Sequence, residues 1–148
     1  MTQITDRDYD CIVTLQNLTS SGWPARVKDI AEDMKVKPPT AVEFLGRLTS
    51  ESLVEKGPTG YRVSKKGAKL LDNVARAHRL LETLLFRAGM SSEKACKIST
   101  SIDRNLDEWA VTEICNQLKH PKTCPHGVPI PPGDPNDQRI AHVVKGSA

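Results

Sequence analysis

The sequence of 148 residues predicts a mainly α-helical protein with two domains, residues 1–72 and residues 73–148. Three observations support this fold class. Apolar residues recur at every third or fourth position along most of the chain, which is typical of amphipathic helices. Only residues 53–55 and 60–63 are β-prone enough to form strands. Residues 64–86 predict one long helix of about 34 Å at 1.5 Å per residue, too long to pack only on the first domain.

The first helix is predicted to run from Asp6 to about Thr19. Thr5 and Asp8 have the spacing of a capping box, in which two residues satisfy hydrogen-bonding groups at the start of a helix. A turn at residues 20–24 follows. The second helix is predicted from apolar residues at the spacing i, i+3, i+4 and i+7, which are Val27, Ile30, Ala31 and Met34.

The third helix is predicted to begin at the proline pair at positions 38 and 39, because proline suits the first turn of a helix. Two strands follow, with a turn at residues 56–59 between them. Residues 25–63 therefore have the order of a winged helix-turn-helix, which places one helix in the major groove of DNA. Each exposed residue here could instead belong to an ordinary solvated face. The residues expected to contact DNA are Lys37, Pro39, Thr40, Glu43, Arg47, Lys56 and Arg62.

The second domain is predicted to continue the long helix until Gly89. Ser91 can cap a fifth helix and Asp107 a sixth, which reaches about Lys119. Residues 120–137 are rich in proline and should be irregular. Helices four to six carry too few apolar residues for a self-sufficient core. We therefore expect this domain to be a dimerisation domain that forms a homodimer, which also suits two-fold related DNA half-sites.

Composition narrows the class of protein. The net charge of +3 and the pI of about 8.7 are too mild to indicate DNA binding by bulk charge. No apolar run approaches the ~20 residues that a membrane span needs, and the polar N-terminus is unlike a secretory signal. A cytoplasmic protein without a membrane partner is expected. In a reducing cytoplasm the four cysteines are better suited to be ligands, redox sensors or core residues than disulfides.

Several residues in the second domain are of types that bind transition metals. His78 and Glu82 are four positions apart, so they project from one helix face and can share an ion. Alone they would more simply be a partly buried histidine and a solvated glutamate. Cys124 and His126 add two more donors, and together these favour a metal site. Cysteine, histidine and carboxylate donors suit Zn²⁺, Fe²⁺ or Co²⁺ rather than Mg²⁺ or Ca²⁺.

Other candidate ligands also have alternative roles. Cys96 and Asp103 share one face of the fifth helix, where a core cysteine and a surface or capping aspartate are also reasonable. Asp8 is accounted for by the capping box, and the neighbouring Cys11 could be a core residue. Cys115 lies among apolar residues and is interpreted as a core residue.

The chain resembles the diphtheria-toxin-repressor family of iron- and manganese-dependent transcription regulators. The resemblance rests on the winged helix-turn-helix, on Ala-His-Arg-Leu-Leu-Glu at residues 77–82, and on His-Pro-Lys-Thr-Cys-Pro-His-Gly-Val-Pro-Ile-Pro at residues 120–131. It is similar to the two-domain type that lacks the SH3-like domain. The family has two metal sites, and the resemblance implies that the one usually called ancillary would take its ligands from His78, Glu82, Cys96, Cys124 and His126.

The resemblance implies a second metal site that this sequence preserves less well. Asp8, Cys11 and Asp103 match acidic or ligand positions of that site in some members. Thr100 stands where a cysteine or glutamate is expected, and Arg104 stands where a histidine is expected. Arginine cannot ligate a metal and adds a positive charge.

The sequence therefore predicts a homodimeric, metal-responsive repressor that binds double-stranded operator DNA and controls metal-homeostasis genes. The expected ion is Fe²⁺ or Mn²⁺, with Zn²⁺ or Co²⁺ possible. The alternative is a redox regulator on the same fold, based on an iron–sulfur cluster or on thiols. An enzyme is not expected, because the sequence contains no catalytic motif such as a metalloprotease helix, a nucleophile elbow or a phosphate-binding loop.

Overall fold

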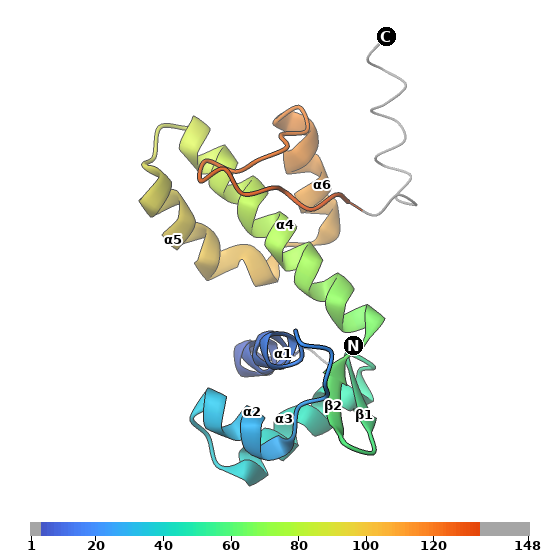
Figure 1. Ribbon diagram of the computed structural model, residues 1–148. Helices are drawn as coiled ribbons and strands as arrows, with labels where there is room; N and C mark the ends of the chain where they lie inside the picture. Colours follow the sequence, from blue (N-terminus) through green and yellow to red (C-terminus); the bar gives the residue numbers. More distant parts are fainter. Residues whose placement is uncertain (1–3, 134–148) are drawn as a thin grey trace. The chain divides into compact units, whose positions relative to one another are not determined.

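The chain divides into two compact units, Met1–Leu71 and Asp72–Ala148, and the computed structural model describes residues 4–133 (Figure 1). The structure is mainly helical with one two-stranded antiparallel sheet, which confirms the predicted fold class. The long helix α4 (Lys65–Arg87) begins in the first unit and continues into the second. None of the helices between residues 4 and 133 has both the length and the apolar character of a membrane span.

The first unit is a winged helix-turn-helix. Three helices contact one another, and the hairpin packs against two of them, because β2 contacts α1 and β1 contacts α3. The sequence prediction placed most of these boundaries within one or two residues. The elements are α1 (Asp6–Leu18), α2 (Val27–Met34), α3 (Pro38–Ser50), β1 (Val54–Gly57) and β2 (Gly60–Val63).

The core of the first unit is aliphatic. One apolar side of each helix supplies it, as the helical spacing of the sequence predicted. Cys11 is also fully buried in this cluster, beside α1 residues that face α2 and α3. Burying each large aliphatic side chain contributes about 1.5–3 kcal/mol. The largest fully buried aliphatic side chains of this core are Ile12, Leu15, Ile30, Leu45, Leu48 and Val54.

The wing is a tight hairpin. Its register pairs Lys56 with Tyr61 and Gly57 with Gly60, so the loop contains only residues 58 and 59. The expected turn at 56–59 was therefore too long, because two of its residues continue the ladder of hydrogen bonds. Gly60 has a φ of +150°, and a Cβ there would lie 2.5 Å from the carbonyl oxygen of Ala25. The close pairing of Ala25 with β2 thus requires glycine at position 60.

Side chains cap three of the helices. Thr5 and Asp8 form the predicted capping box at the start of α1. Ser64 Oγ accepts a hydrogen bond from the Gly67 amide at the start of α4 and donates one to the Ser52 carbonyl. Ser91 caps α5 (Ser92–Ile102) by accepting from the Lys94 amide. These bonds satisfy amides that have no partner within the helix.

The second unit has a small core. It joins α4 to α6 (Glu108–Gln117), while α5 leads into a short 3₁₀ turn at Asp103–Asn105 that the sequence did not predict. Cys115 is buried beside Val111 and Leu118, which confirms its interpretation as a core residue. Several large apolar side chains of this unit remain exposed, including Ile98, Ile102 and Trp109. A small core together with exposed apolar residues is typical of a surface that packs against another chain.

A buried ion pair joins α1 to α3 within the first unit. Arg47 Nη2 lies 2.8 Å from Asp8 Oδ1, and Arg47 Nε is 3.1 Å from the same oxygen. The Asp8 side chain is 1% exposed and the Arg47 side chain 43% exposed. Burial by itself raises the pKa of Asp8, but the hydrogen bonds from Arg47 and Thr5 outweigh it and hold the pKa below its ordinary value of 3.8. The stabilisation is therefore present above that value and is lost as the pH falls through the lower folded-state pKa.

The unequal burial of the two partners predicts unequal effects of removing them. Arg47→Gln leaves a buried carboxylate without its cation and should lower the free energy of unfolding by about 3 kcal/mol. Asp8→Asn leaves a guanidinium that water can solvate and should lower it by about 1 kcal/mol. Urea denaturation at neutral pH measures both values. Equal effects of the two substitutions would contradict the described burial.

Candidate metal centre

Five of the predicted metal ligands gather in the second unit. His78 and Glu82 project from α4, Cys96 from α5, and Cys124 and His126 from the segment that follows α6. They form two groups of three, each with donor atoms within 4.8 Å of one another. The first group is His78, Glu82 and Cys96, and the second is Glu82, Cys124 and His126.

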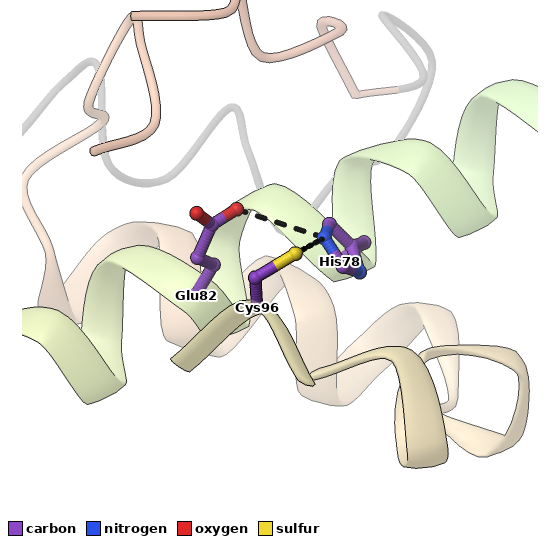
Figure 2. A group of neighbouring side chains, drawn as sticks. All are labelled: His78, Glu82 and Cys96. Carbon is purple, nitrogen blue, oxygen red and sulfur yellow. Dashed lines mark hydrogen bonds and ion pairs between the residues drawn. The ribbon is translucent and has the colours of Figure 1, made fainter. Parts of the chain in front are cut away.

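The first group surrounds one nitrogen of His78. Its Nε2 atom lies 3.6 Å from Glu82 Oε2 and 3.6 Å from Cys96 Sγ. Figure 2 shows the carboxylate and the thiol converging on the same side of the imidazole ring. The spacing of His78 and Glu82, one helical turn apart on α4, places both side chains on one face. Cys96 reaches them from α5, so the group depends on two helices.

The second group depends on a turn at residues 124–127. The Gly127 amide donates to the Cys124 carbonyl over 2.8 Å, and the Cys124 amide donates to the Val128 carbonyl over 3.0 Å. Gly127 has a φ of +76°, a backbone conformation that glycine adopts without strain. The turn brings the side chains of Cys124 and His126 to the same carboxylate, Glu82, whose Oε1 contacts His126 Nδ1.

Two contacts hold this segment on the rest of the unit. Arg79 Nη1 donates a hydrogen bond of 2.8 Å to the Pro129 carbonyl. Ile130 packs against the core formed by α4 and α6. Arg79 is adjacent to His78 in the sequence, but nothing in the spacing of residues indicated this supporting role.

Asp103 orients His78 from the other side of the ring. Its Oδ2 lies 3.1 Å from His78 Nδ1, and its side chain is buried. Since a carboxylate only accepts hydrogen bonds, the neutral ring facing it carries its proton on Nδ1. The lone pair of Nε2 then points toward Glu82 and Cys96. Such carboxylate–histidine pairs commonly fix the orientation of a metal ligand.

The remaining predicted ligands are not members of these groups, although Asp103 contacts His78. Among residues 4–133, neither group includes Asp8, Cys11 or Asp103. Asp8 is paired with Arg47, a pairing the sequence did not indicate. Burial and the nearby charge of Asp8 raise the pKa of Cys11 to about 12, which keeps it a thiol rather than the thiolate that metals bind. Thr100 donates a hydrogen bond to the Cys96 carbonyl one turn earlier on α5.

The donor set fits a divalent transition metal. Glu82 is only 2% exposed, and its two oxygens face His78 and His126. A carboxylate buried to this degree needs a compensating positive charge. Imidazole, thiolate and carboxylate donors converging on it are those of Fe²⁺, Co²⁺ or Zn²⁺ sites.

The residues predicted to contact DNA lie on the surface of the first unit. Thr40 is half-buried and the others are exposed. Lys37 is the N-cap of α3, and Lys56 lies over the Tyr61 ring at 5.9 Å. Arg47 forms an ion pair with Asp8 and packs over the ring of Phe44. Its guanidinium could contact a base only if these two interactions were broken.

Comparisons with known proteins find relatives that match most of the chain. The model of the iron dependent repressor, metal binding and dimerisation domain matches residues 64–132. An uncharacterised HTH-type transcriptional regulator of Aeropyrum pernix is 33% identical over 130 residues, which cover 85% of this chain and 71% of that protein. A hypothetical protein of Sulfolobus solfataricus has a TM-score of 0.83 at 29% identity, over 87% of this chain and 100% of that one. ScaR with bound Zn²⁺ has a TM-score of 0.70 at 30% identity, over 85% of this chain and 60% of that one.

The winged helix-turn-helix and the match to the metal-binding and dimerisation domain place the chain among metal-dependent transcriptional regulators, a class that also includes the manganese regulator SloR, at 30% identity. The chain belongs to the diphtheria-toxin-repressor family, which confirms the resemblance seen in its sequence. Members of this family dimerise and bind DNA operators, and the matching proteins are regulators rather than enzymes.

The contact between Asp103 and His78 predicts an indirect effect on metal binding. Asp103→Asn should weaken Co²⁺ binding about 10–100-fold, because the ring loses the carboxylate that fixes its tautomer and orientation. The absorption of the fully loaded protein should stay unchanged, because the ligands remain. Titration with Co²⁺ followed by visible absorption measures both quantities. Asp107→Asn, at an exposed N-cap, is the matched control, and an altered spectrum of the loaded Asp103 variant would show that Asp103 is itself a ligand.

Proposed function

We propose that this protein is a cytoplasmic, homodimeric repressor that binds operator DNA when a divalent metal occupies the second unit, and so controls metal-homeostasis genes. The observation that carries this proposal is the convergence of four donor residues on a fifth, the buried Glu82, in a unit that matches the metal-binding domain of iron-dependent repressors. The ligands of the proposed site are His78, Glu82, Cys96, Cys124 and His126.

The donor chemistry favours Fe²⁺ over Mn²⁺ as the regulatory ion. Mn²⁺ is best served by carboxylate, carbonyl and water oxygens, whereas each group here contains a thiol and an imidazole. Zn²⁺ and Co²⁺ suit the same donors and should bind in vitro. The Zn²⁺ bound to ScaR shows that a related protein accepts this ion.

The exposed residues of α3 and the wing support DNA binding by the first unit. Lys37 at the start of α3 can contact phosphate together with the helix N-terminus. Lys56 and Arg62 on the hairpin are exposed and can contact the backbone beside the groove. Pro39, Thr40 and Glu43 lie on the first turns of α3, where a recognition helix presents side chains to base edges.

Metal can be linked to DNA binding through the dimer. The proposed ion ties together α4, α5 and the segment at 124–127. The same unit carries exposed apolar side chains on its three helices, among them Phe86 on α4, Ile98 on α5 and Trp109 on α6. An ion that stabilises this arrangement favours the form that dimerises. The two DNA-binding units of one dimer then bind two half-sites with higher effective affinity than a single unit binds one.

The cysteine positions do not favour an iron–sulfur cluster or a thiol switch. A cluster requires several thiolates around one site. Cys11 and Cys115 each lie in the hydrophobic core of their own unit. Cys96 and Cys124 belong to different donor groups, each completed by histidine and glutamate. Single metal ions suit this distribution better.

Metal should strengthen binding to a specific DNA site. The site can be selected from a pool of random duplexes under anaerobic conditions with Fe²⁺. We expect affinity for the selected duplex to rise roughly 5–150-fold with Fe²⁺ relative to chelator, the range of typical allosteric coupling. Cys124→Ala should lose most of this response, whereas Cys115→Ala should keep it. Equal affinity with metal and with chelator would refute the proposed function.

The exposed apolar side chains of the second unit predict which residue contributes most to the stability of the dimer. Trp109 is 61% exposed on α6, and a tryptophan is often dominant in an interface. Trp109→Ala should weaken the dimer by about 2 kcal/mol, or roughly 30-fold. Sedimentation equilibrium measures this constant. Trp23→Ala, in the first unit, serves as the control, and a change as large as that of Trp109→Ala would place the interface elsewhere.

A further inference from the structure

A pocket of about 240 Å³ lies within the second unit, lined by residues other than the proposed metal ligands. Its walls come from α4, from α6 and from the segment that follows α6, which returns across α4 (Figure 1). A space of this size admits a small molecule rather than a single water. The pocket is therefore a candidate binding site that the metal ligands do not account for.

Arg76 of α4 is a buried cation in the wall of this pocket. The residue is only 6% exposed. Among residues 4–133 its side chain has no hydrogen bond or ion pair, whereas Arg79 and Arg87 on the same helix each donate to a backbone carbonyl. A guanidinium keeps its charge and presents five N–H donors. Burial without an acceptor is unfavourable, and a negatively charged occupant of the pocket would supply one.

The other charged lining residue is also a cation. Lys122 is exposed at the edge of the pocket, and none of the lining residues is acidic. The charge that an occupant meets is thus positive. An ion that enters the pocket gains two cations and meets no opposing carboxylate in the wall.

His120 is held at the pocket by a backbone conformation that is uncommon for its residue type. Lys119 and His120 have φ values of +59° and +53°. Such conformations cost free energy in residues other than glycine and are maintained where the surrounding structure fixes them. Here the His120 amide donates to the Cys115 carbonyl over 3.0 Å, and His120 Nδ1 lies 3.4 Å from Cys115 Sγ. The imidazole is thereby placed as a third nitrogen group at the pocket.

The rest of the wall is largely apolar and stiff. Pro121, Ile130 and Pro131 line it, and proline has a fixed φ. Small-molecule sites commonly combine apolar walls with a few polar groups that fix the orientation of the ligand. Walls that are already rigid lose little conformational entropy when a ligand binds.

We propose that this pocket binds a small oxyanion, a carboxylate or a phosphate, with its oxygens on Arg76 and with His120 and Lys122 beside it. The planar guanidinium matches two oxygens of either group. This site is separate from the proposed metal site and goes beyond the proposed function. An occupant that contacts α4, α6 and the segment after α6 would also stabilise the segment that carries Cys124 and His126.

The test is isothermal titration calorimetry of the full chain, freed of metal and held in Tris buffer, with inorganic phosphate, succinate and butyrate as separate probes. We expect saturable binding of one equivalent per chain for at least one probe. The same probe should raise Tm, because it binds the folded chain. Binding of phosphate alone would assign the site to phosphates, and binding of either acid would assign it to carboxylates. Absence of saturable binding for all three probes would overturn the proposal.

Arg76→Met distinguishes a ligand-binding arginine from a structural one. Methionine keeps an unbranched stem but removes the charge. We expect affinity for the bound probe to fall at least about tenfold, since hydrogen bonds to a charged group are lost. Tm without the probe should stay the same or rise, because a buried charge without a partner has been removed. A lower Tm without the probe, or an unchanged affinity, would show that Arg76 does not serve this site.

Two further variants place the binding at the pocket. Lys122→Gln should weaken binding of the same probe without changing Tm in its absence, because Lys122 is an exposed lining residue. Lys94→Gln, which removes an exposed positive charge from α5, is the matched control and should bind the probe as the wild type does. Equal losses in Lys122→Gln and Lys94→Gln would mean that the probe responds only to net charge, and would overturn the proposed site.

Discussion

The carboxylate of Glu82 is the group on which the second unit depends. It is enclosed by α4, by Cys96 of α5 and by the turn at residues 124–127, with a histidine against each oxygen. A negative charge in such a place is unfavourable unless cations or donors surround it. The segments that meet there are otherwise joined by a core of few buried residues. The buried negative charge of Glu82 thus favours an arrangement in which three segments of the chain bring donor groups to it.

The first unit also contains a buried carboxylate, and an arginine side chain balances its charge. Asp8 is as deeply buried as Glu82, but its partner is the guanidinium of Arg47 and its remaining bonds come from Thr5. The Asp8 site is thus satisfied by the protein itself. Asp8 and Arg47 are 39 positions apart in the chain, and each was expected to have a different role, one with metal and one with DNA. The cation that balances Asp8 therefore belongs to the chain itself.

Local signals in the sequence were enough to predict the helices and to select five donor residues that the structure brings together. Thr5, Ser91 and the proline pair at the start of α3 set helix starts through backbone amides a few residues away, so their effect can be read from spacing. Long-range contacts could not be predicted in this way. The grouping of four donors around Glu82 depends on the hydrogen bond from Arg79 to the Pro129 carbonyl and on the packing of Ile130 against the core. Neither contact can be predicted from hydrophobic periodicity or from a capping pattern in the sequence.

The turn at residues 124–127 has a consequence for the lifetime of a bound ion. His126 is 46% exposed at its side chain, while Cys124 is buried and the segment is held on the rest of the unit by Arg79 and by Ile130. An ion bound by Cys124 and His126 could leave only past the imidazole of His126 or after the turn has detached. Local opening of such a segment needs less free energy than unfolding of the whole unit. In the proposed repressor, the residence time of the ion, and with it the delay before repression ends, would be limited by the detachment of a short loop.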